Sequence, residues 1–582
     1  MTHSTHFGAF FSFALGLWLS GCNSNGMMYS IEADPAVVLP EYDLGVSGDL
    51  GEDVAISGEV SAYLSVATAK SNGLATSPVC AECHANSSSS SAMKDAAGRN
   101  IAPFDLWQST MKANAARDPF FRAVMSAESY RHPEASDVIE ATYLRCHSPA
   151  GAVAAERMGT TISLANSTTA GEIGDMASDG VNCVACHAIT DVGLGTMESY
   201  SAGWILDTSD RMFGPHKNPF TMPMKNRSGF TPTSSDHMME SELCATCHTL
   251  FTATFLEDGT IAEKPFPEQT PYLEWKNSDF AIGATAQSCQ DCHMPTVDQD
   301  GIAINTRIAH KPDGTDFGQI DSRNPYGRHL LVGGNIWVPQ IFQKHRDTLG
   351  PQATDAAFDA TIVATIDQLQ NRTAELTLAN AVMAPGSASF DVKVENLTGH
   401  KFPSGYPSRR AWIRVRIFDG ANRVLWESGG FDDAGDITGE KTGEPRLHRT
   451  SVESADDIQI YEGVLGDEHS ASTVALLHAD QYFKDNRLLP KGWRSDHEDI
   501  EHMRPVGTEG DSDFVGGSDT TAYAATFEGT PAKIEVSLHY QALGNRWIRE
   551  LLRVPTADVQ AFGGMWSSID RRPVTISAAT FP

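Results

Sequence analysis

The chain has 582 residues, of which 41% are hydrophobic and 20% charged, and its formal net charge is −31 at pH 7. This length exceeds one ordinary hydrophobic core, so we expect two or three domains. The globular composition excludes an intrinsically disordered chain. The negative charge disfavours nucleic acid and anionic membrane surfaces as partners. It fits a cationic or redox partner protein, or simply keeps an exported protein soluble.

The N-terminus has the features of an export signal. Residues 7–19 form an apolar run that is too short to span a bilayer but suits a signal-peptide core. The run ends in Leu-Ser-Gly-Cys22, which resembles a bacterial lipobox. We predict that residues 1–22 are a lipoprotein signal, that Cys22 is acylated, and that residues 23–75 are a tether.

Asn23 after this cysteine favours an outer-membrane location, with the protein exported and anchored on the periplasmic or cell-surface face. The alternative is a plain secretory signal with an incidental cysteine. The segment before the apolar run contains histidines but no Lys or Arg, which departs from a typical signal peptide.

Eight of the nine cysteines after Cys22 form four copies of one pattern, Cys-x-x-Cys-His. The cysteines are Cys80 and Cys83, Cys183 and Cys186, Cys244 and Cys247, and Cys289 and Cys292, and the histidines that follow are His84, His187, His248 and His293. Two thiols at this spacing add to the two vinyl groups of one porphyrin, and the next histidine presents its imidazole to the iron from the proximal side. The sequence therefore predicts four covalently attached haems c.

Other chemistries fit this pattern less well. A zinc ribbon needs two Cys-x-x-Cys pairs close enough to share one metal, without a histidine after each pair. A thioredoxin-like motif occurs once, in a βαβ unit. Structural disulfides form in exported chains, but a Cys-x-x-Cys loop is short and strained.

After the first motif, short helices are expected over residues 105–117 and 119–131, and a third over 136–144 with Ser136 as its N-cap. The third helix leads into Tyr143-Leu-Arg-Cys146-His147, where a tyrosine stands in the place of a first cysteine. A lone thiol is unusual in an oxidising compartment, and one thioether still tethers a porphyrin. We therefore predict a fifth haem held by Cys146 with His147 as ligand. The alternative is a buried structural Cys-His pair.

Residues 76–350 contain many Gly, Pro, Asn and Ser residues and few strand-like runs, which predicts an irregular, mainly helical or loop domain packed around its haems. A helix over 355–370 is followed by segments that alternate with period two and are rich in β-branched and aromatic residues. These strands are expected at 373–383, 389–397, 410–419, 422–428, 458–465, 472–479, 532–540 and 574–581. Residues 351–582 are thus predicted to form an all-β sandwich of immunoglobulin-like architecture.

Candidates for the sixth iron ligand are histidines in turn-like surroundings. They are His216, His237, His310, His329 and His400, with His132 and His345 as substitutes. Met111, Met238 and Met239 are weaker candidates, because methionine at such positions is more often part of the core. Each histidine alone is as compatible with a surface or hydrogen-bonded role as with ligation.

His400 belongs to the predicted β domain, so ligation by it would fix that domain to the haem domain. Arg409 and Arg410, close by in the sequence, are candidates for pairing with haem propionates. The alternative is an ordinary turn with solvated arginines.

Several stretches together resemble exported multihaem c-type cytochromes with a C-terminal β-sandwich. They are LWQSTMKANAARDPFF, YLRCHSPAG, DGVNCVACH, SELCATCHT, SCQDCHMP, TGHKFPSGYPSRRAWIRV and DNRLLPKGW, and the likeness covers roughly residues 75–560. The resemblance implies bis-histidine haems, His400 as a distal ligand, and electron transfer in the bacterial envelope. Tyr143 departs from the family pattern, which has a cysteine there.

These features predict an envelope electron carrier with four or five haems, relaying single electrons to redox partners towards the outer membrane or extracellular acceptors, without a substrate site of its own. One alternative is a multihaem oxidoreductase in which one haem, most naturally that of His147, has an open position for a small nitrogen or sulfur compound. Another is a subunit of a haem-conducting extracellular filament, as one form of homo-oligomer.

Overall fold

The computed structural model describes residues 62–440 and 445–582. The predicted signal, Cys22 and most of the predicted tether lie outside the described residues. Residues 62–75, the described end of that tether, pack against the rest of the molecule. They contain a small hairpin, β1 (Lys70–Ser71) and β2 (Leu74–Ala75), whose second strand is buried, and the Tyr63 N–H donates to Thr348 O at 2.8 Å.

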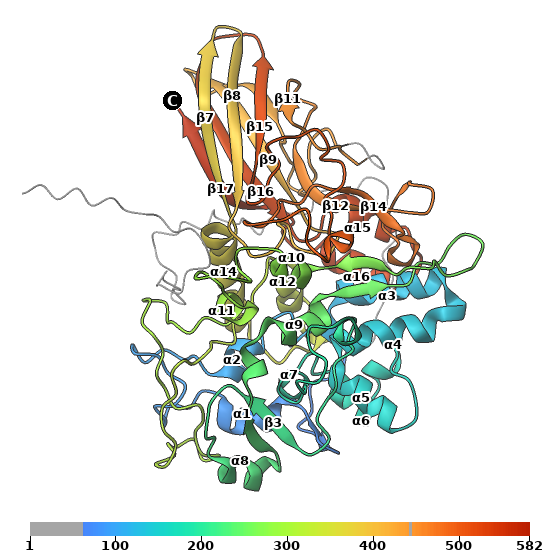
Figure 1. The fold of residues 1–582 in the computed structure, drawn as a ribbon, viewed down its shortest axis with the longest axis vertical. Helices are drawn as coiled ribbons and strands as arrows, with labels where there is room; N and C mark the ends of the chain where they lie inside the picture. The colour runs from blue at the N-terminus through green and yellow to red at the C-terminus, as the bar shows by residue number, and fades with distance from the viewer. Residues whose placement is uncertain (1–61, 441–444) are drawn as a thin grey trace, which may run out of the picture.

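The first half of the described chain is built of short helices joined by long loops (Figure 1). They are α1 (Ser77–His84), α2 (Pro103–Trp107), α3 (Pro119–Arg131), α4 (Ser136–His147), α5 (Pro149–Arg157), α6 (Glu172–Ala177), α7 (Cys183–His187), α8 (Thr221–Ser228), α9 (Ser241–His248), α10 (Pro271–Lys276) and α11 (Cys289–His293). Two short strand pairs lie among them, β3 (Arg211–Gly214) with β4 (Thr231–Ser234) and β5 (Leu250–Thr252) with β6 (Phe266–Gln269). This irregular, helical region agrees with the sequence prediction.

The predicted helix over 105–117 is largely wrong. After α2 the chain makes turns, because side chains compete with the helical backbone for its carbonyl groups. The Thr110 hydroxyl donates to Trp107 O at 2.7 Å, and the Asn114 amide donates to Gln108 O at 3.1 Å and Thr110 O at 2.9 Å. The next helix is α3 as predicted, and the carboxylate of Asp118 caps it.

α4 is longer than predicted and begins without the expected cap. Ala135 is the N-cap residue, and the Ser136 hydroxyl donates to Pro133 O at 3.1 Å. The helix continues through Cys146 to His147.

The second half is rich in strands. After α12 (Trp337–Lys344), α13 (Arg346–Leu349) and α14 (Asp355–Arg372) come β7 (Ala374–Ala384), β8 (Ser387–Asn396), β9 (Arg410–Asp419), β10 (Val424–Ser428), β11 (Ser451–Val452), β12 (Ile460–Gly466), β13 (Ser472–Thr473), β14 (Gln481–Asp485), β15 (Ser518–Thr526), β16 (Pro531–Gln541) and β17 (Val574–Phe581). Seven of the eight predicted strands are found. In the eighth, 472–479, two residues form β13 and a 3-10 turn follows at Leu476–His478.

The strands form two sheets that share one apolar core. One sheet has the order β13-β12-β9-β16-β17, with β10 and β14 beside it, and the other the order β11-β15-β8-β7. Alternate residues of β8, β9 and β16, such as Val392, Val415 and Val536, are fully buried between the sheets. A helical region followed by a two-sheet region is therefore observed, whereas the immunoglobulin-like topology stays a prediction.

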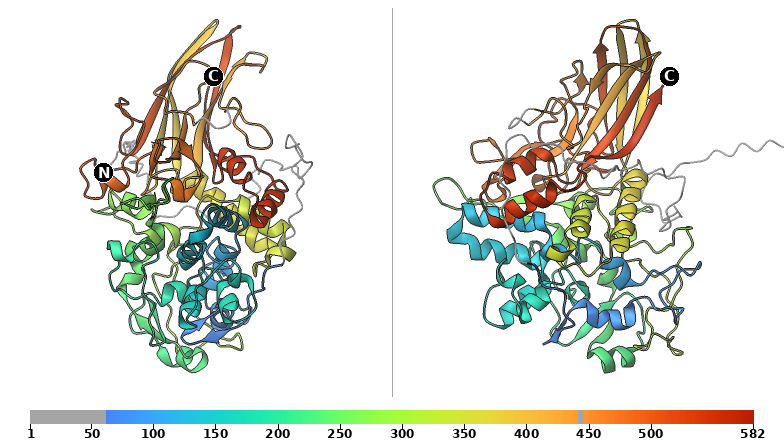
Figure 2. Two further views of the ribbon diagram at one scale, coloured as in Figure 1. Left: turned by 90° about the vertical axis from the view of Figure 1, so that its right-hand side faces the viewer. Right: turned by 180° about the vertical axis from the view of Figure 1, so that it is seen from behind.

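Two helices of the second half were not expected from the sequence, α15 (Asn545–Leu551) and α16 (Ala557–Trp566). α16 packs against α3 of the helical region, with the rings of Phe120 and Phe562 5.5 Å apart. The turned views in Figure 2 show these helices between the sheets and the helical region. One hydrophobic cluster runs through both halves, so the sheets are not a loosely attached appendage.

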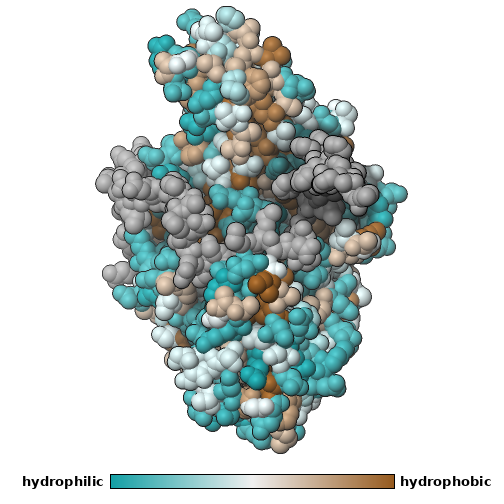
Figure 3. Space-filling view, turned by 90° about the vertical axis from the view of Figure 1, so that its left-hand side faces the viewer, coloured by the Kyte–Doolittle hydropathy of each residue, from teal (hydrophilic) through white to brown (hydrophobic). Residues whose placement is uncertain are grey.

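Within residues 62–440 and 445–582 no helix is long and apolar enough to cross a membrane. The face in Figure 3 is a mixture of hydrophilic and hydrophobic side chains, with narrow hydrophobic strips over the strands. Among the exposed apolar residues is Val382 of β7.

Candidate functional site

All five Cys-His sequences have the same local structure. α1, α7, α9 and α11 each end at the histidine of a Cys-x-x-Cys-His motif, and α4 ends in the same way at His147. One helical turn places the two cysteines of a motif on one face. In α4 the first of these positions is held by Tyr143. The motif at Tyr143 and Cys146 therefore has the same backbone structure as the four complete motifs.

Four of the five histidines are held in one tautomer. Their Nδ1 atoms hydrogen-bond backbone carbonyls, with His84 bonded to Ile308 O at 2.8 Å, His147 to Ala115 O at 3.2 Å, His187 to Phe213 O at 2.6 Å, and His293 to Val332 O at 3.0 Å. A metal-binding histidine is typically oriented by such a bond from its other ring nitrogen. Nε2 is the atom left for a metal.

Burial lowers the pKa of all four of these histidines, to about 4 for His147 and His293. Each imidazole is therefore neutral near pH 7, which is the form that binds iron. The thiols and the neutral, oriented imidazoles fit a covalently attached haem at each motif, with one thioether rather than two at Cys146.

The cysteines of different motifs meet one another. A hydrogen bond with Cys80 raises the pKa of Cys183, and equivalent bonds join Cys146 to Cys247 and Cys244 to Cys289. Cys186 lies close enough to Cys247 for that thiol to raise its pKa further, after burial. All nine thiols are free of disulfides. The motifs thus form one continuous cluster, in which the motif at Cys244 is next to three others.

His329 faces His187. Their ring centres are 6.3 Å apart and the ring planes differ by 22°. Nδ1 of His329 bonds Gly327 O at 3.2 Å, so in both residues Nε2 is the available nitrogen. Two imidazoles that bind one ion from opposite sides, each at about 2 Å, have ring centres roughly 6 Å apart. Of the five candidates, His329 has the geometry of a distal ligand.

His400 lies at the junction of the two regions, next to His293. It is partly buried, its Nδ1 bonds Lys401 O at 2.9 Å, and it lowers the pKa of His293, second to burial. Gly399 before it has no room for a side chain, since a Cβ would lie 3.1 Å from Trp275 Cδ1 and 3.2 Å from Phe280. The loop that carries His400 therefore lies close to α10 at Gly399.

A buried ion-pair network holds this loop in place. Lys401 Nζ lies 2.6 Å from Asp485, Arg487 pairs with Asp485 at 2.7 Å and with Glu274 of α10 at 3.3 Å, and the Lys401 N–H donates to Glu274 at 3.0 Å. Burial by itself would raise the pKa of Asp485, but Arg487 and Lys401 bring it down to about 2. The two cations therefore stabilise the ionised form of the Asp485 carboxylate.

The other candidate histidines have different surroundings. Both ring nitrogens of His237 are hydrogen-bonded, to Ser235 and Ile189 O, and those of His310 to Lys311 O and Ala85 O. These contacts favour a structural role. His216 is partly buried near Arg323, and both lower its pKa.

The substitute ligands also have partners. His132 Nε2 lies 3.1 Å from His478 Nε2, and His345 Nε2 lies 2.8 Å from the Ser568 hydroxyl. Met238 is buried and Met111 packs against the main core, as expected for methionines that are not ligands.

The two arginines proposed for propionates differ. Arg410 is buried in the sheet region. Its guanidinium donates hydrogen bonds to both carboxylate oxygens of Glu440 at 2.9 Å and to the side-chain oxygen of Gln541 at 2.9 Å. This pairing favours a structural role and leaves Arg409 as the propionate candidate. Arg409 hydrogen-bonds Ser404, and its charge lowers the pKa of His248 and His400.

Tyr143 is part of a buried polar pair. Its hydroxyl donates to Glu268 Oε2 at 2.9 Å. Burial raises the pKa of Glu268 to about 7, although the bond from Tyr143 lowers it. Tyr143, which stands at the first position of the fifth motif, therefore provides a hydrogen-bond donor for the buried carboxyl group of Glu268.

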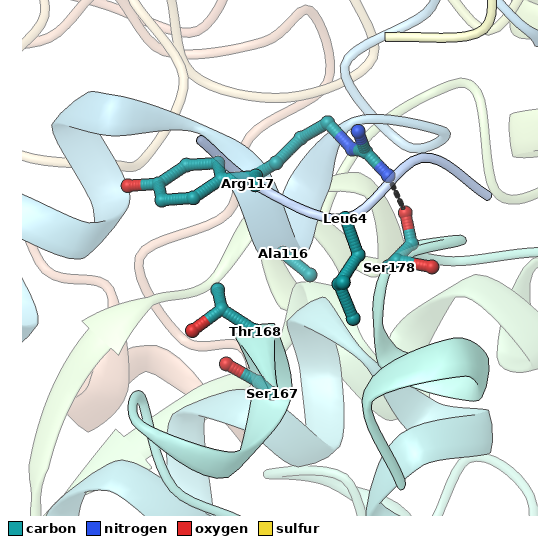
Figure 4. A pocket seen from close by; sticks show the side chains of 7 residues that line it. Leu64, Ala116, Arg117, Ser167, Thr168 and Ser178 are labelled. Atoms are coloured by element: carbon teal, nitrogen blue, oxygen red, sulfur yellow. Dashed lines mark hydrogen bonds between the residues drawn. The ribbon is translucent and has the colours of Figure 1, made fainter. Parts of the chain in front are cut away.

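Neither of two pockets found in the described part of the chain is lined by His147. A pocket of about 10 Å³ lies between Leu64, Ala116, Ser167 and Thr168, where Arg117 donates to Ser178 O (Figure 4). It has room for about one water molecule.

A larger pocket of about 580 Å³ is lined by Arg131, His478, Arg546 and Arg553. It lies at the end of α3 where α4 begins, whereas His147 is at the far end of α4.

Sequence reasoning missed Lys112, whose Nζ lies 3.0 Å from His248 Nε2. Its charge is the largest influence that lowers the pKa of His248. Sequence reasoning also missed Glu274. A lysine and a glutamate far from the motifs in the chain carry no local signal for such roles.

No family model matches the chain, and no curated protein matches it. Among solved structures, the chain is similar to a penta-heme cytochrome c552 from Thermochromatium tepidum, with a TM-score of 0.49 and 16% sequence identity over 88% of this chain and 100% of that one. A likeness at this level establishes no function for the chain.

Proposed function

We propose that the chain is a multihaem c-type cytochrome that relays single electrons through five covalently bound haems. The observation that carries the proposal is the clustering of five Cys-His motifs, distant in sequence, with cysteines of neighbouring motifs in contact. These thiols would hold neighbouring porphyrins close to one another, and short distances between haems are what electron tunnelling needs. Haem supplies the one-electron chemistry of its iron.

The protein's own groups do three things. The thiols fix each haem so that it is not lost outside the cytoplasm. The backbone carbonyls hold the proximal histidines neutral and oriented. His329 is the distal ligand that the ring geometry favours for the motif of His187. His400 is the candidate for the motif of His293, whose pKa it lowers. Arg409 is available for a propionate.

The cellular context belongs to the same proposal. Cys22 is acylated after removal of the signal, and the protein is anchored in the envelope at the outer membrane. Its partners are redox proteins of the envelope, and the net charge of −31 favours a partner that presents a basic surface.

The second candidate function is a multihaem oxidoreductase with an open position at the haem of His147. A specific observation favours it. After burial, the charged group that lowers the pKa of His147 is Lys112, and none of the described histidines contributes. The imidazole is stacked on Phe121 at 3.7 Å, which is a hydrophobic setting for the ring.

Mass spectrometry of the mature protein under denaturing conditions tests the proposal, since it counts attached haems and detects the lipid on Cys22. We expect five haems. A colourless chain without added porphyrin mass contradicts the proposal. Low-temperature EPR separates the two functions, because low-spin iron throughout supports the carrier and a high-spin ferric signal supports the oxidoreductase.

A further inference from the structure

We propose that Lys112 is the sixth ligand of the haem attached at Cys244 and Cys247, opposite His248. The inference rests on the proposed function and names a ligand for one of its haems. It starts from the distance of 3.0 Å between Lys112 Nζ and His248 Nε2. In the other four motifs, the Nδ1 bonds leave Nε2 as the metal-binding atom. Lys112 therefore points at the place where the iron of this motif belongs.

The contact differs from an ordinary lysine contact. Lysines are usually solvated or paired with an acid. Among the described residues, the polar contact of the Lys112 side chain is with His248, and no carboxylate lies within ion-pair distance. Its charge instead influences the pKa of motif residues, among them His147, Cys186 and His293. The amine is thus placed in the middle of the haem cluster without an acid to neutralise it.

The backbone around Lys112 is held rigidly. The Val181 N–H donates to Lys112 O at 2.9 Å, and the Trp107 indole donates to Val181 O at 3.0 Å. Gly180, at φ +59°, allows this approach, because a Cβ would lie 2.6 Å from the carbonyl oxygens of Lys112 and Ala113. The same segment leads into the motif at Cys183. The base of the side chain is fixed, and its flexible four carbons reach to His248.

Coordination requires only a small adjustment. Two nitrogens that bind one iron from opposite sides are about 4 Å apart. Lys112 Nζ would therefore have to move about 1 Å away from His248 Nε2. A role as partner of a haem propionate fits less well. Propionates lie at the edge of the porphyrin, whereas Nζ is next to the nitrogen that binds iron at the centre. A neutral amine is a good ligand for iron.

The test uses the haem-loaded, exported protein with Lys112→Ala and Lys112→Arg variants. We expect each variant to convert one ferric haem per chain from low-spin to high-spin in EPR, and to bind one added imidazole per chain. Arginine keeps the positive charge but does not ligate, so low-spin iron throughout in Lys112→Arg means that Lys112 acts by charge, and overturns the proposal. Low-spin iron throughout in Lys112→Ala overturns it as well.

A direct readout complements the variants. In the reduced protein with isotope-labelled lysine, the methylene protons of a coordinated lysine are shifted far upfield in NMR by the porphyrin ring current. We expect the signal of one such lysine, and we expect it to be lost in both Lys112 variants. The control is Lys311→Ala, which should keep the signal. Lys311 also lies near a motif, because it follows His310, whose backbone N–H donates to Cys83 O. Absence of a shifted lysine in the wild type contradicts the proposal. Intact mass separates this failure from that of the proposed function, which predicts the five haems whatever the ligand.

Discussion

At the scale of single residues, the structure assigns each histidine by the atoms that its ring nitrogens contact. Four of the five motif histidines and His329 use Nδ1 for a carbonyl, which leaves Nε2 available for a metal. His237 is buried beside Phe213, and both of its ring nitrogens form hydrogen bonds, to Ser235 and to Ile189 O. His237 is thus more buried than His187 or His329, yet it has no ring nitrogen left for a metal.

This contrast gives the first prediction. His329→Ala removes the ligand opposite His187, so we expect one haem per chain to become high-spin. His237→Ala is the matched control, and should leave every haem low-spin while lowering the free energy of unfolding by about 1–3 kcal/mol for the lost buried hydrogen bonds. EPR and denaturant unfolding measure the two effects. The reverse pattern of spin states would make His237 the ligand.

The pair of Tyr143 and Glu268 predicts a pH dependence. Burial raises the pKa of Glu268 from its ordinary 4.5 to about 7, so between these values the folded state binds more protons than the unfolded state. Its contribution to stability is therefore present at low pH and is lost as the pH rises through this window, at up to about 1.4 kcal/mol per pH unit.

Glu268→Gln keeps a hydrogen-bond acceptor for Tyr143 and does not titrate. We expect the difference in unfolding free energy between pH 5 and pH 7 to shrink in this variant, as measured by guanidinium unfolding followed by circular dichroism. An unchanged difference would mean that Glu268 is ionised throughout. Asp118 is a second buried acid with a pKa of about 7, so the dependence shrinks without vanishing.

At the scale of elements, the loop that carries His400 is fixed to α10 by buried charges. Glu274 is fully buried and bridges Arg487 and the backbone of Lys401. Removing one partner of a buried pair leaves an uncompensated charge, which costs about 3–5 kcal/mol. An exposed pair is worth about 1 kcal/mol or less.

The matched variants are Glu274→Gln and Glu498→Gln, because Glu498 forms an exposed pair with Lys276 of the same helix at 2.7 Å. We expect a loss of about 3 kcal/mol or more in the first variant and under about 1 kcal/mol in the second. We also expect a changed EPR signal for one haem in Glu274→Gln alone, because the loop of His400 loosens. Similar stabilities for both variants would refute a locking role for the network.

At the scale of the whole molecule, the motifs form a branched path. The motif at Cys80 meets that at Cys183, and the motif at Cys244 lies next to those at Cys183, Cys146 and Cys289. If Cys146 carries a fifth haem, the path has a branch, or arm, at that motif. With four haems it has none.

Two serine variants test this arm. Cys146→Ser removes the only thioether of its site, so the denatured chain should carry four haems by mass. Cys183→Ser leaves Cys186 in place, which makes that site resemble the native one at Cys146, so five haems should remain. If Cys146→Ser and the wild type have equal haem mass, then Cys146 holds no haem and is a buried structural thiol.

Much of the fold could be read from periodicity. The long strands β7, β8, β9, β16 and β17 were found because alternation reports one buried face. β15 was missed because its threonines and alanines give a weak pattern, and α15 and α16 because their helical segments lie between predicted strands. The turns after α2 depend on side-chain hydrogen bonds that compositional reasoning does not reveal.

The sequence by itself determined the positions of the Cys-His motifs, since a Cys-x-x-Cys-His motif is contiguous and one helical turn is enough to build it. Only the tertiary structure decided which histidines lie near the motifs and which motifs are neighbours. It also decided which groups Lys112, Glu274 and Arg410 contact. A sixth ligand approaches from a distant part of the chain. Its position is set by packing across the whole molecule and leaves no local pattern to read.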